Sequence, residues 1–546
     1  MSEADITTQH SGAARLTGRG PRHGAAKKRR GLRGSPGLTL LAAALGVMMV
    51  AIDGTIVSVA NPAIQSNLGA SLTGIQWVTN GYLLALAITL ITIGKVGDRF
   101  GHKKVFLTGI VGFAATSAAI GLGGDIAHSI TLMITFRVLQ GVFGAMLQPT
   151  ALALLRETFP IEKLNSAIGI WGGVIGASTA AGPIVGGLLV QHINWEACFY
   201  VNVPVGIVAL ALGLLVLTET PSSPAAKSFD IPGIGLLTAF LFLLVWVLIK
   251  GSSYGWGSGT ALAYYAGSAV ALALFIVREL TAKAPLLPLN LFRSVALSAG
   301  TVLVLALMFA MFGAMFFMTF FMENVHGLDP VATGVRLLPM TGMLIVGAPL
   351  SGRLIGRIGA RAPMVIGMLM AAAALFGLSR VGLASSLNDT IIWFALLGLG
   401  LSPVMVGATE VIVGNAPVSL AGVAGGLQST AMQVGGTIGT AVLGSVMASK
   451  VASTLPSHWA AAHLPALTPS QLAGVESATE VGLAPVQKGV PAQVAAAITD
   501  VAHAAFVSGM TTAFAVAAFV AIAGALVALL TGKRRADGRH SAPLMH

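Results

Sequence analysis

Four polar residues lie within apolar stretches of this sequence and could carry chemistry: Asp53, Arg137, Gln140 and Glu410. A charged side chain inside a helix in lipid costs about 2.5 to 3.5 kcal/mol on insertion scales, so Asp53 must face a cavity, pair with a cation or bind a proton. Arg137 stays charged at any accessible pH and needs an acidic or carbonyl partner. Gln140 lies one turn further along the same helix face. The group could therefore exchange a proton for a bound cargo.

Glu410 is the second acid within a predicted helix, and it could bind a cationic cargo or a second proton with its pKa raised by desolvation. It also lies near Gly414, close to the predicted cytoplasmic end of its helix, so a surface position is equally compatible with the sequence.

The stretches that must position these residues are long and apolar. Of 546 residues, 55% are hydrophobic and only 9% are charged, against roughly 25% charged in a typical soluble domain. We find about fourteen apolar runs, each near the roughly twenty residues that a helix needs to cross a bilayer core. Because lipid satisfies no unpaired backbone group, the sequence predicts an all-α integral membrane fold.

Lys and Arg residues give the orientation. With a cytoplasmic N-terminus, 25 of the 31 basic residues fall in cytoplasmic segments. This positive-inside pattern, with an even number of spans, predicts that both termini are cytoplasmic. The net charge of +12 and the basic run at 27–30 are then explained by topology, and no nucleic-acid partner is expected.

An internal repeat gives the domain organisation. The loop sequence at 94–103 recurs at 352–361, in a second predicted cytoplasmic loop. Two halves of like orientation, related by an axis along the membrane normal, create a central site that can open to either side. The predicted divisions are a basic tail at 1–37, an N-terminal six-helix half at 38–217, a linking helix pair at 231–278, a C-terminal six-helix half at 296–531 that contains an extracellular loop at 449–507, and a cytoplasmic tail at 532–546.

Five motifs resemble the major facilitator superfamily, and within it the fourteen-span drug:H+ antiporter branch. They lie at 53–62, 94–104, 137–145, 169–187 and 195–206. The resemblance covers nearly the whole chain after residue 38 and implies the fold of that superfamily. It also makes Arg137 part of proton coupling. Glu196 departs from the Arg usual in the fifth motif; we expect it at the outer surface, with Trp195 as an interfacial anchor.

Two of these motifs have expected mechanical roles. The resemblance implies that the 94–104 loop latches the two halves in the outward-facing state, and the glycines there permit a tight turn. The expected latch residues are Gly94, Asp98, Arg99, Gly101 and Lys103. In the fifth span, small residues allow close helix approach and a proline permits a bend, both useful at a rocking interface. The residues of this antiporter motif are Gly182, Pro183, Gly186 and Gly187.

The sequence offers no cofactor site. It contains no Walker motif for ATP and no His or Cys cluster with metal-ligand spacing, and the lone Cys198 excludes an internal disulfide. We therefore expect a non-enzymatic protein driven by the proton gradient. The expected partners are a small lipophilic substrate, protons and membrane lipid, and we expect a monomer in a bacterial cytoplasmic membrane.

The predicted function is proton-coupled efflux of a lipophilic drug or antibiotic. An importer or uniporter of a small metabolite on the same scaffold is the first alternative, and a non-transporting membrane enzyme or sensor is the second. The charge of the substrate stays open, since Asp53 allows lipophilic cations while Arg137 allows neutral or anionic compounds.

Overall fold

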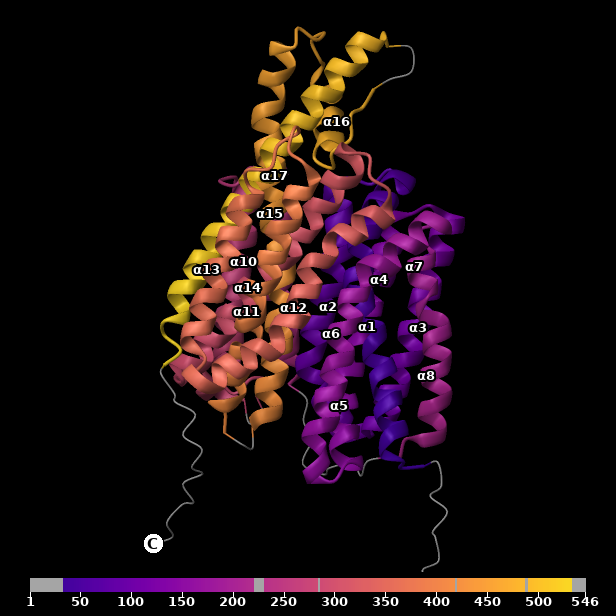
Figure 1. Cartoon of the computed structure of the whole chain (residues 1–546), viewed down its shortest axis with the longest axis vertical. Coiled ribbons are helices and arrows are strands. Elements are labelled where there is room, and N and C mark those ends of the chain that lie inside the picture. The colour runs from indigo at the N-terminus through magenta and orange to yellow at the C-terminus, as the bar shows by residue number, and fades with distance from the viewer. Residues whose placement is uncertain (1–32, 220–229, 283–284, 418–419, 487–489, 533–546) are drawn as a thin grey trace, which may run out of the picture.

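A computed structural model describes residues 33–219, 230–282, 285–417, 420–486 and 490–532 of the chain. The described elements are helices (Figure 1). Most of the two predicted tails, including the basic run at 27–30, lies outside the described residues.

The N-terminal half begins at Pro36 and ends at Val216. Its helices are α1 (Pro36–Leu68), α2 (Leu72–Phe100), α3 (His102–Ala127), α4 (Ile130–Ala145), α5 (Leu147–Thr158), α6 (Ile161–His192), α7 (Ala197–Tyr200) and α8 (Asn202–Val216). Helices α4 and α5 form one apolar span from Ile130 to Thr158. The helix thus continues past the predicted end of this span at residue 152, and Arg156 and Glu157 lie on its last turn.

Two linking helices and the C-terminal half follow. The linking helices are α9 (Ile231–Tyr254) and α10 (Gly259–Thr281). The C-terminal half consists of η2 (Leu289–Arg293), α11 (Val295–Phe320), η3 (Phe321–Val325), α12 (Pro330–Ile358), α13 (Arg361–Leu378), α14 (Leu387–Gly414), α15 (Ala421–Ala461), α16 (Pro469–Thr479) and α17 (Ala492–Ala528). Helix α11 is apolar on all sides, as expected of a helix that is buried on nearly all sides.

Among the described residues, 13 helices are long and apolar enough to cross a membrane. The remaining predicted span corresponds to α2, which has 29 residues. At 1.5 Å per residue α2 would be about 43 Å long. The exact number of fourteen stays a prediction.

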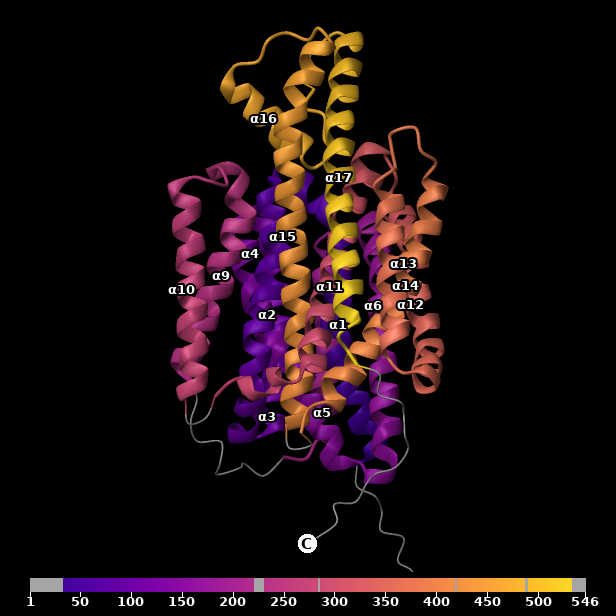
Figure 2. The same cartoon turned by 90° about the vertical axis from the view of Figure 1, so that its left-hand side faces the viewer.

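The same helix pairs pack in each half. In the N-terminal half α1 packs on α6, α2 on α4 and α3 on α8; in the C-terminal half α11 packs on α15, α12 on α14 and α13 on α17. The halves are joined mainly by α2 with α15 and by α6 with α12, and less extensively by α1 with α11 and α12. Helices α9 and α10 pack on each other, and α9 also contacts α2 and α15. The linking pair therefore lies beside the contact between α2 and α15 (Figure 2).

The segment at 449–507, predicted as an extracellular loop, is helical over much of its length; we call it the cap. It comprises the projecting parts of α15 and α17 together with α16 (Figures 1 and 2). The Trp459 indole donates to the carbonyl of Pro465 at 2.9 Å. The Asn324 amide donates to the carbonyl of Val481 at 2.7 Å and ties the cap to η3.

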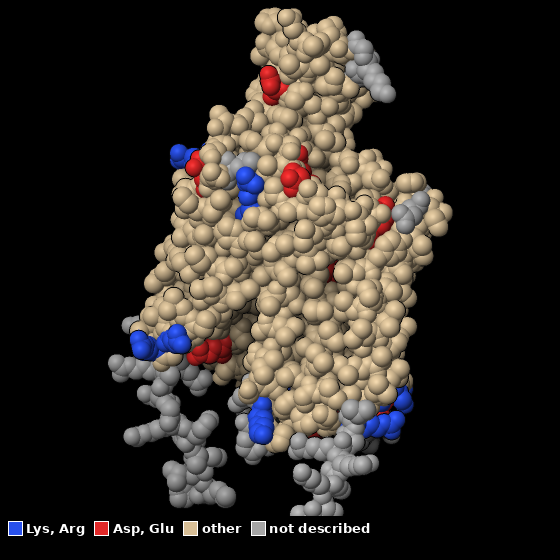
Figure 3. Space-filling model, turned by 45° about the vertical axis from the view of Figure 1, so that its right-hand side comes forward, with Lys and Arg blue, Asp and Glu red and all other residues tan. Residues whose placement is uncertain are grey.

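On the face that Figure 3 shows, charged side chains gather toward the two ends of the molecule, and a broad belt with few charges separates them. We call the end from which the cap projects the cap end and the opposite one the basic end. The described chain begins and ends at the basic end (Figure 1). An uncharged belt between two charged rims is the surface that a bilayer requires.

Candidate functional site

A buried ion pair joins the first and fourth predicted spans. The Arg137 guanidinium on α4 donates from Nη1 to Asp53 Oδ2 on α1 at 2.6 Å. Both side chains are almost fully buried, Asp53 being 0% and Arg137 1% exposed. Arg137 Nε also donates to the carbonyl of Val78 on α2, at 3.1 Å. The acidic and carbonyl partners that Arg137 requires are thus both present, from two different helices.

Uncharged side chains complete the shell around the Asp53 carboxylate. The amide Nε2 of Gln140 donates to Asp53 Oδ1 at 3.0 Å and to the Ser117 hydroxyl at 2.6 Å. Asn202 Nδ2 lies 3.4 Å from the same Oδ1 and 3.3 Å from Ser117. Gln140 Oε1 in turn accepts from Arg137 Nη1 at 2.6 Å. Each charge is therefore hydrogen-bonded on several sides, which a buried pair needs to offset its desolvation.

Small residues bring the helices of this site together. At Gly141, one residue after Gln140, a Cβ atom would lie 2.4 Å from the backbone oxygen of Tyr82 on α2. Only glycine allows this approach of α4 to α2. The close contact places the ring of Tyr82 over the guanidinium, with Arg137 Cζ 4.1 Å from the ring centroid.

A cavity of about 550 Å³ lies between the two halves and is lined by residues of both. Its polar lining residues are Thr55, Tyr82, Gln148, Thr179, Ser402, Ser429 and Gln433, and its methionines are Met308, Met311, Met405 and Met432. No described residue that lines it carries a charged side chain. A space of this size with an apolar, methionine-rich wall and a few neutral polar groups suits a lipophilic molecule of drug size.

Asp53 itself does not line this cavity, although its neighbours Gly54 and Thr55 do. Direct competition between a cationic substrate and a proton at Asp53 would need the ion pair to open first. Glu410 is exposed on α14 and is likewise absent from the cavity lining. The structure therefore brings together Asp53, Arg137 and Gln140 and leaves Glu410 apart.

The loop between α2 and α3 makes its described contacts within the N-terminal half. Asp98 Oδ1 lies 3.1 Å from His102 Nε2, and Lys103 Nζ donates to the carbonyl of Leu217 at 2.6 Å. Gly101 has φ of +94°, which favours glycine at this turn. Gly94 and Arg99 lie on the last turns of α2. The latch role of these residues stays a prediction.

The antiporter motif on α6 forms a close contact at the cap end. A Cβ atom on Gly187 would lie 2.4 Å from the carbonyl oxygen of Pro330, and one on Gly334 would lie 2.3 Å from that of Pro183. A Cβ atom on Gly182 would likewise collide with Thr55 of α1, and one on Gly186 would collide with Ile56. These glycines bring α6 against α12 and α1 with little space between the backbones.

Nearer the basic end, α6 has no such contact. Around Gly169, Gly172, Gly173 and Gly176 no atom lies within 4 Å of an added Cβ. The surface is hollowed between the two halves toward the basic end (Figure 3). In this conformation the halves meet at the cap end and part toward the basic end.

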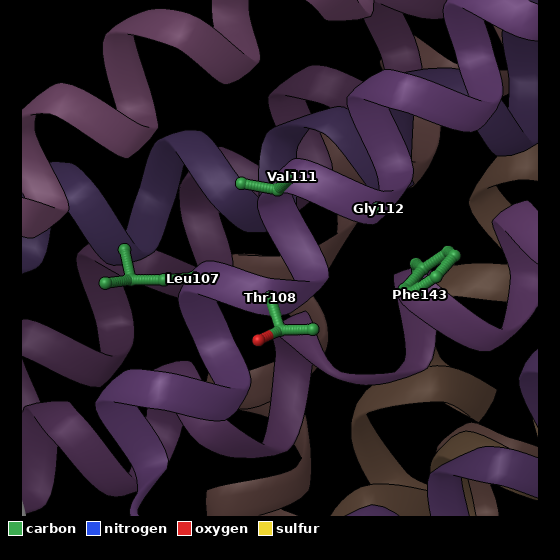
Figure 4. Close-up of a pocket in the computed structure, with 5 residues that line it drawn as sticks. All are labelled: Leu107, Thr108, Val111, Gly112 and Phe143. Atoms are coloured by element: carbon green, nitrogen blue, oxygen red, sulfur yellow. The ribbon is translucent and has the colours of Figure 1, made fainter.

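Two further features bear on the site. A second pocket of about 380 Å³ is lined by Leu107, Thr108, Val111 and Gly112 of α3 and by Phe143 of α4, and Asp53 and Arg137 are not among its lining residues (Figure 4). It is almost wholly apolar and offers no group for recognition.

The expectation of surface positions for Trp195 and Glu196 is wrong, because the two residues are only 4% and 5% exposed. The Trp195 ring packs directly on Gly124, in the space that a Cβ atom there would need.

Three residues of the site, Tyr82, Ser117 and Asn202, carry little or no signal of their role in the sequence. Asn202 belongs to the fifth motif, and this was the one available signal for it. Ser117 and Tyr82 lie in predicted spans, where a neutral polar residue gives no indication of its partner.

The chain is similar to known proteins over most of its length. The chain is 57% identical over 509 residues, covering 93% of this chain and 94% of the relative, to the tetracenomycin C resistance and export protein of Streptomyces glaucescens. It is 31% identical over 492 residues to the multidrug efflux pump LfrA of Mycolicibacterium smegmatis, covering 90% and 95% of the two chains.

A solved structure has a similar fold: a bacterial homologue of the human lysosomal transporter Spinster, in an inward-facing and occupied conformation. It is 16% identical, with a TM-score of 0.59 over 90% of this chain and 96% of that one. The sequence profile of the Major Facilitator Superfamily matches residues 43–440. With two packed halves, a central cavity and these relatives, the chain belongs to the Major Facilitator Superfamily.

Proposed function

We propose that this protein exports a lipophilic antibiotic across the bacterial cytoplasmic membrane in exchange for protons. The observation that carries the proposal is the cavity between the halves beside the buried Asp53–Arg137 pair: its lining includes Gly54 and Thr55, which follow Asp53, and Tyr82, whose ring lies over Arg137. The 57% identical export protein suggests tetracenomycin C, or a compound like it, as the cargo. The basic end faces the cytoplasm in this proposal, so the described conformation loads cargo from the inside.

Proton exchange follows from the chemistry of the pair. While Asp53 is ionised, Arg137 holds it and the two charges offset each other. A proton on Asp53 removes the negative charge and leaves Arg137 with only neutral partners, which favours a rearrangement of α1 against α4. A proton taken up from the outside and released to the cytoplasm would return the pair to its starting state. Each proton contributes about 2.3 kcal/mol per 100 mV of membrane potential.

The topology, the coupling ion and the oligomeric state belong to the same proposal. Both termini are cytoplasmic, protons alone drive transport, and one chain suffices because the cavity is formed by its own two halves.

Transport in everted membrane vesicles tests the proposal. We expect accumulation of tetracenomycin C that collapses when a protonophore is added, and at least a tenfold loss of accumulation in Asp53→Asn. Glu410→Gln is the matched control, since it neutralises an acid that lies outside the cavity, and it should transport like the wild type. Accumulation that persists after the protonophore is added, or full proton-coupled transport by the Asp53→Asn protein, would refute proton exchange.

A further inference from the structure

The two main contacts between the halves differ in how tightly they are packed. Where α2 meets α15, the Gln76 amide donates to the carbonyl of Thr440 at 2.8 Å. Further along the same helices, the Thr430 hydroxyl donates to the carbonyl of Ala87 at 3.4 Å, and both contacts are buried. Eleven residues of α2 separate Gln76 from Ala87, which is about 16 Å of helix. The α2–α15 contact is therefore closed over at least that length.

The linking pair covers the outside of the α2–α15 contact. One buried apolar cluster joins all three parts, and its members include Leu84 of α2, Leu241 and Val245 of α9 and Ala441 of α15. The linking pair and the α6–α12 contact lie on opposite sides of the molecule, at the left and toward the right of Figure 2. The linking pair thus closes one flank of the cavity and leaves the other uncovered.

The α6–α12 contact is tightly packed near the cap end and loose toward the basic end. Near the cap end, the backbones of the two helices meet at Gly187 of α6 and Gly334 of α12. Toward the basic end, no atom lies within 4 Å of a Cβ atom added at Gly172, Gly173 or Gly176. The two helices therefore leave free space between them over this part of their length.

The wall of the central cavity is exposed at this loose part of the contact. All the exposed residues among the described cavity lining belong to α6 or α12, namely Gly172, Gly173, Ala177, Ile345 and Pro349. The lining residues of the other helices are buried or half-buried. The cavity thus opens sideways between α6 and α12, and we call these five residues the doorway.

The depth and the chemistry of the doorway suit lipid. Helix α6 begins at the basic end, and Gly173 is 12 residues from Ile161, its first residue, which is about 18 Å of helix. On α12 the exposed Arg353 lies one turn beyond Pro349 toward the basic end and marks the charged rim. The doorway itself contains no charged or polar side chain. In the proposed orientation it therefore lies at the depth of the cytoplasmic leaflet.

We propose that the cargo enters the cavity sideways from the cytoplasmic leaflet of the membrane, through the doorway between α6 and α12. This inference rests on the proposed function, which supplies a lipophilic cargo and the orientation of the basic end. A lipophilic molecule concentrates in the hydrocarbon layer because its apolar surface leaves water there. Entry from lipid spares that surface a return to water. The small residues of α6 then allow α12 to close over the doorway when the basic ends of the halves approach each other.

Spin labels test whether the doorway faces lipid. The lone Cys198 is buried, so a cysteine introduced as Gly173→Cys or Ile345→Cys can be labelled selectively in the full-length protein in phospholipid vesicles. We expect both labels to collide more often with oxygen, which dissolves in lipid, than with a water-soluble nickel chelate. Ser457→Cys, an exposed position in the cap, is the control, and collisions with nickel should dominate there. An excess of nickel collisions at both doorway positions would overturn entry from lipid.

Binding kinetics test whether the cargo uses the doorway. Gly173→Trp fills the opening, and its Cβ atom meets no other atom within 4 Å. We expect the association and dissociation rates of tetracenomycin C, measured with protein in phospholipid vesicles, to fall together by at least fivefold. The Kd should stay within twofold of the wild-type value, because a narrowed entrance slows both directions equally. Wild-type rates, or a weakened Kd with an unchanged association rate, would overturn the doorway as the route.

The matched control is Gly235→Trp on α9. Gly235 is also exposed and has no atom within 4 Å of an added Cβ, but it lies outside the cavity lining. Its variant should bind tetracenomycin C at wild-type rates.

The spin-label result does not depend on transport, so the two proposals can fail separately. Doorway labels that face water in a protein that exports tetracenomycin C would refute this inference and leave the proposed function intact. Doorway labels that face lipid in a protein that does not export it would support the sideways opening and refute the proposed function.

Discussion

Asp53 and Arg137 are stable in the interior only as a pair. Their burial removes the hydration of two full charges, and the surrounding amides and hydroxyls replace it with fixed hydrogen bonds. The same shell keeps water away, so the charge of the pair can change only by a proton or by movement of a helix.

This pairing predicts a non-additive effect on stability. Arg137→Met leaves the Asp53 carboxylate buried without its cation, which should destabilise the protein by about 3 to 5 kcal/mol. The double substitution Asp53→Asn with Arg137→Met removes both charges and should recover most of that loss. Thermal unfolding of the purified variants in detergent measures both values. A double variant no more stable than Arg137→Met would show that the pair is not coupled in this way.

At the scale of the helix, glycine spacing decides which faces can meet. On α6 the glycines near the cap end abut backbone atoms of α12 and α1, whereas those nearer the basic end face open space. Helix α6 is thus tightly packed on its glycine face near the cap end and unpacked on it toward the basic end. This is the asymmetry that alternating access requires.

We expect Gly334→Ala to hold the two halves apart at the cap end. Its new methyl group would lie 2.3 Å from the carbonyl oxygen of Pro183, and a backbone atom cannot move aside as a flexible side chain does. Transport should fall at least tenfold, and hydrogen exchange should rise at the cap ends of α6 and α12. Gly169→Ala is the control, because no atom lies within 4 Å of that position. Equal exchange in the two variants would contradict a seal at this contact.

At the scale of the whole molecule, the cap gives the two faces different chemistry. The basic end carries Lys and Arg side chains on the face that Figure 3 shows. At the cap end, Glu476 lies on α16 and Glu480 follows it directly, and both residues are partly buried. Burial raises the pKa of Glu480 to about 7, and the neighbouring Glu476 carboxylate adds to the rise. This group is therefore protonated in the folded cap at mildly acidic pH.

The sign of the pH dependence follows from that shift. Because the pKa of Glu480 in the folded cap exceeds its ordinary value of 4.5, its contribution to cap stability is fully present below about 4.5 and is lost as the pH rises through about 7. The protection factors of the Gly482 and Leu483 amides, which are corrected for the intrinsic rise of hydrogen exchange with pH, should fall from pH 5 to pH 8. Glu480→Gln should flatten the profile, and Glu476→Gln should only shift it to lower pH. An unchanged profile in Glu480→Gln would exclude this group as the cause.

The sequence alone determined that the chain is a helical membrane protein, and it predicted the order and orientation of the spans. Apolar runs and the distribution of Lys and Arg are one-dimensional properties, since a bilayer selects each span by its own length and polarity. It also marked Asp53, Arg137 and Gln140, because a charged or strongly polar residue in an apolar run must have a special environment. The repeated loop at 94–103 and 352–361 indicated two like halves before any packing was known.

Only the tertiary structure decided which groups meet. Asp53 contacts Arg137 across 84 residues and Asn202 across 149, and such contacts depend on how whole helices cross. The uncharged wall of the cavity, the position of the Tyr82 ring over Arg137 and the exposed position of Glu410 likewise depend on how each helix is rotated about its axis. In a helix that is apolar all round, the sequence does not specify that rotation, because every face has nearly the same hydrophobicity.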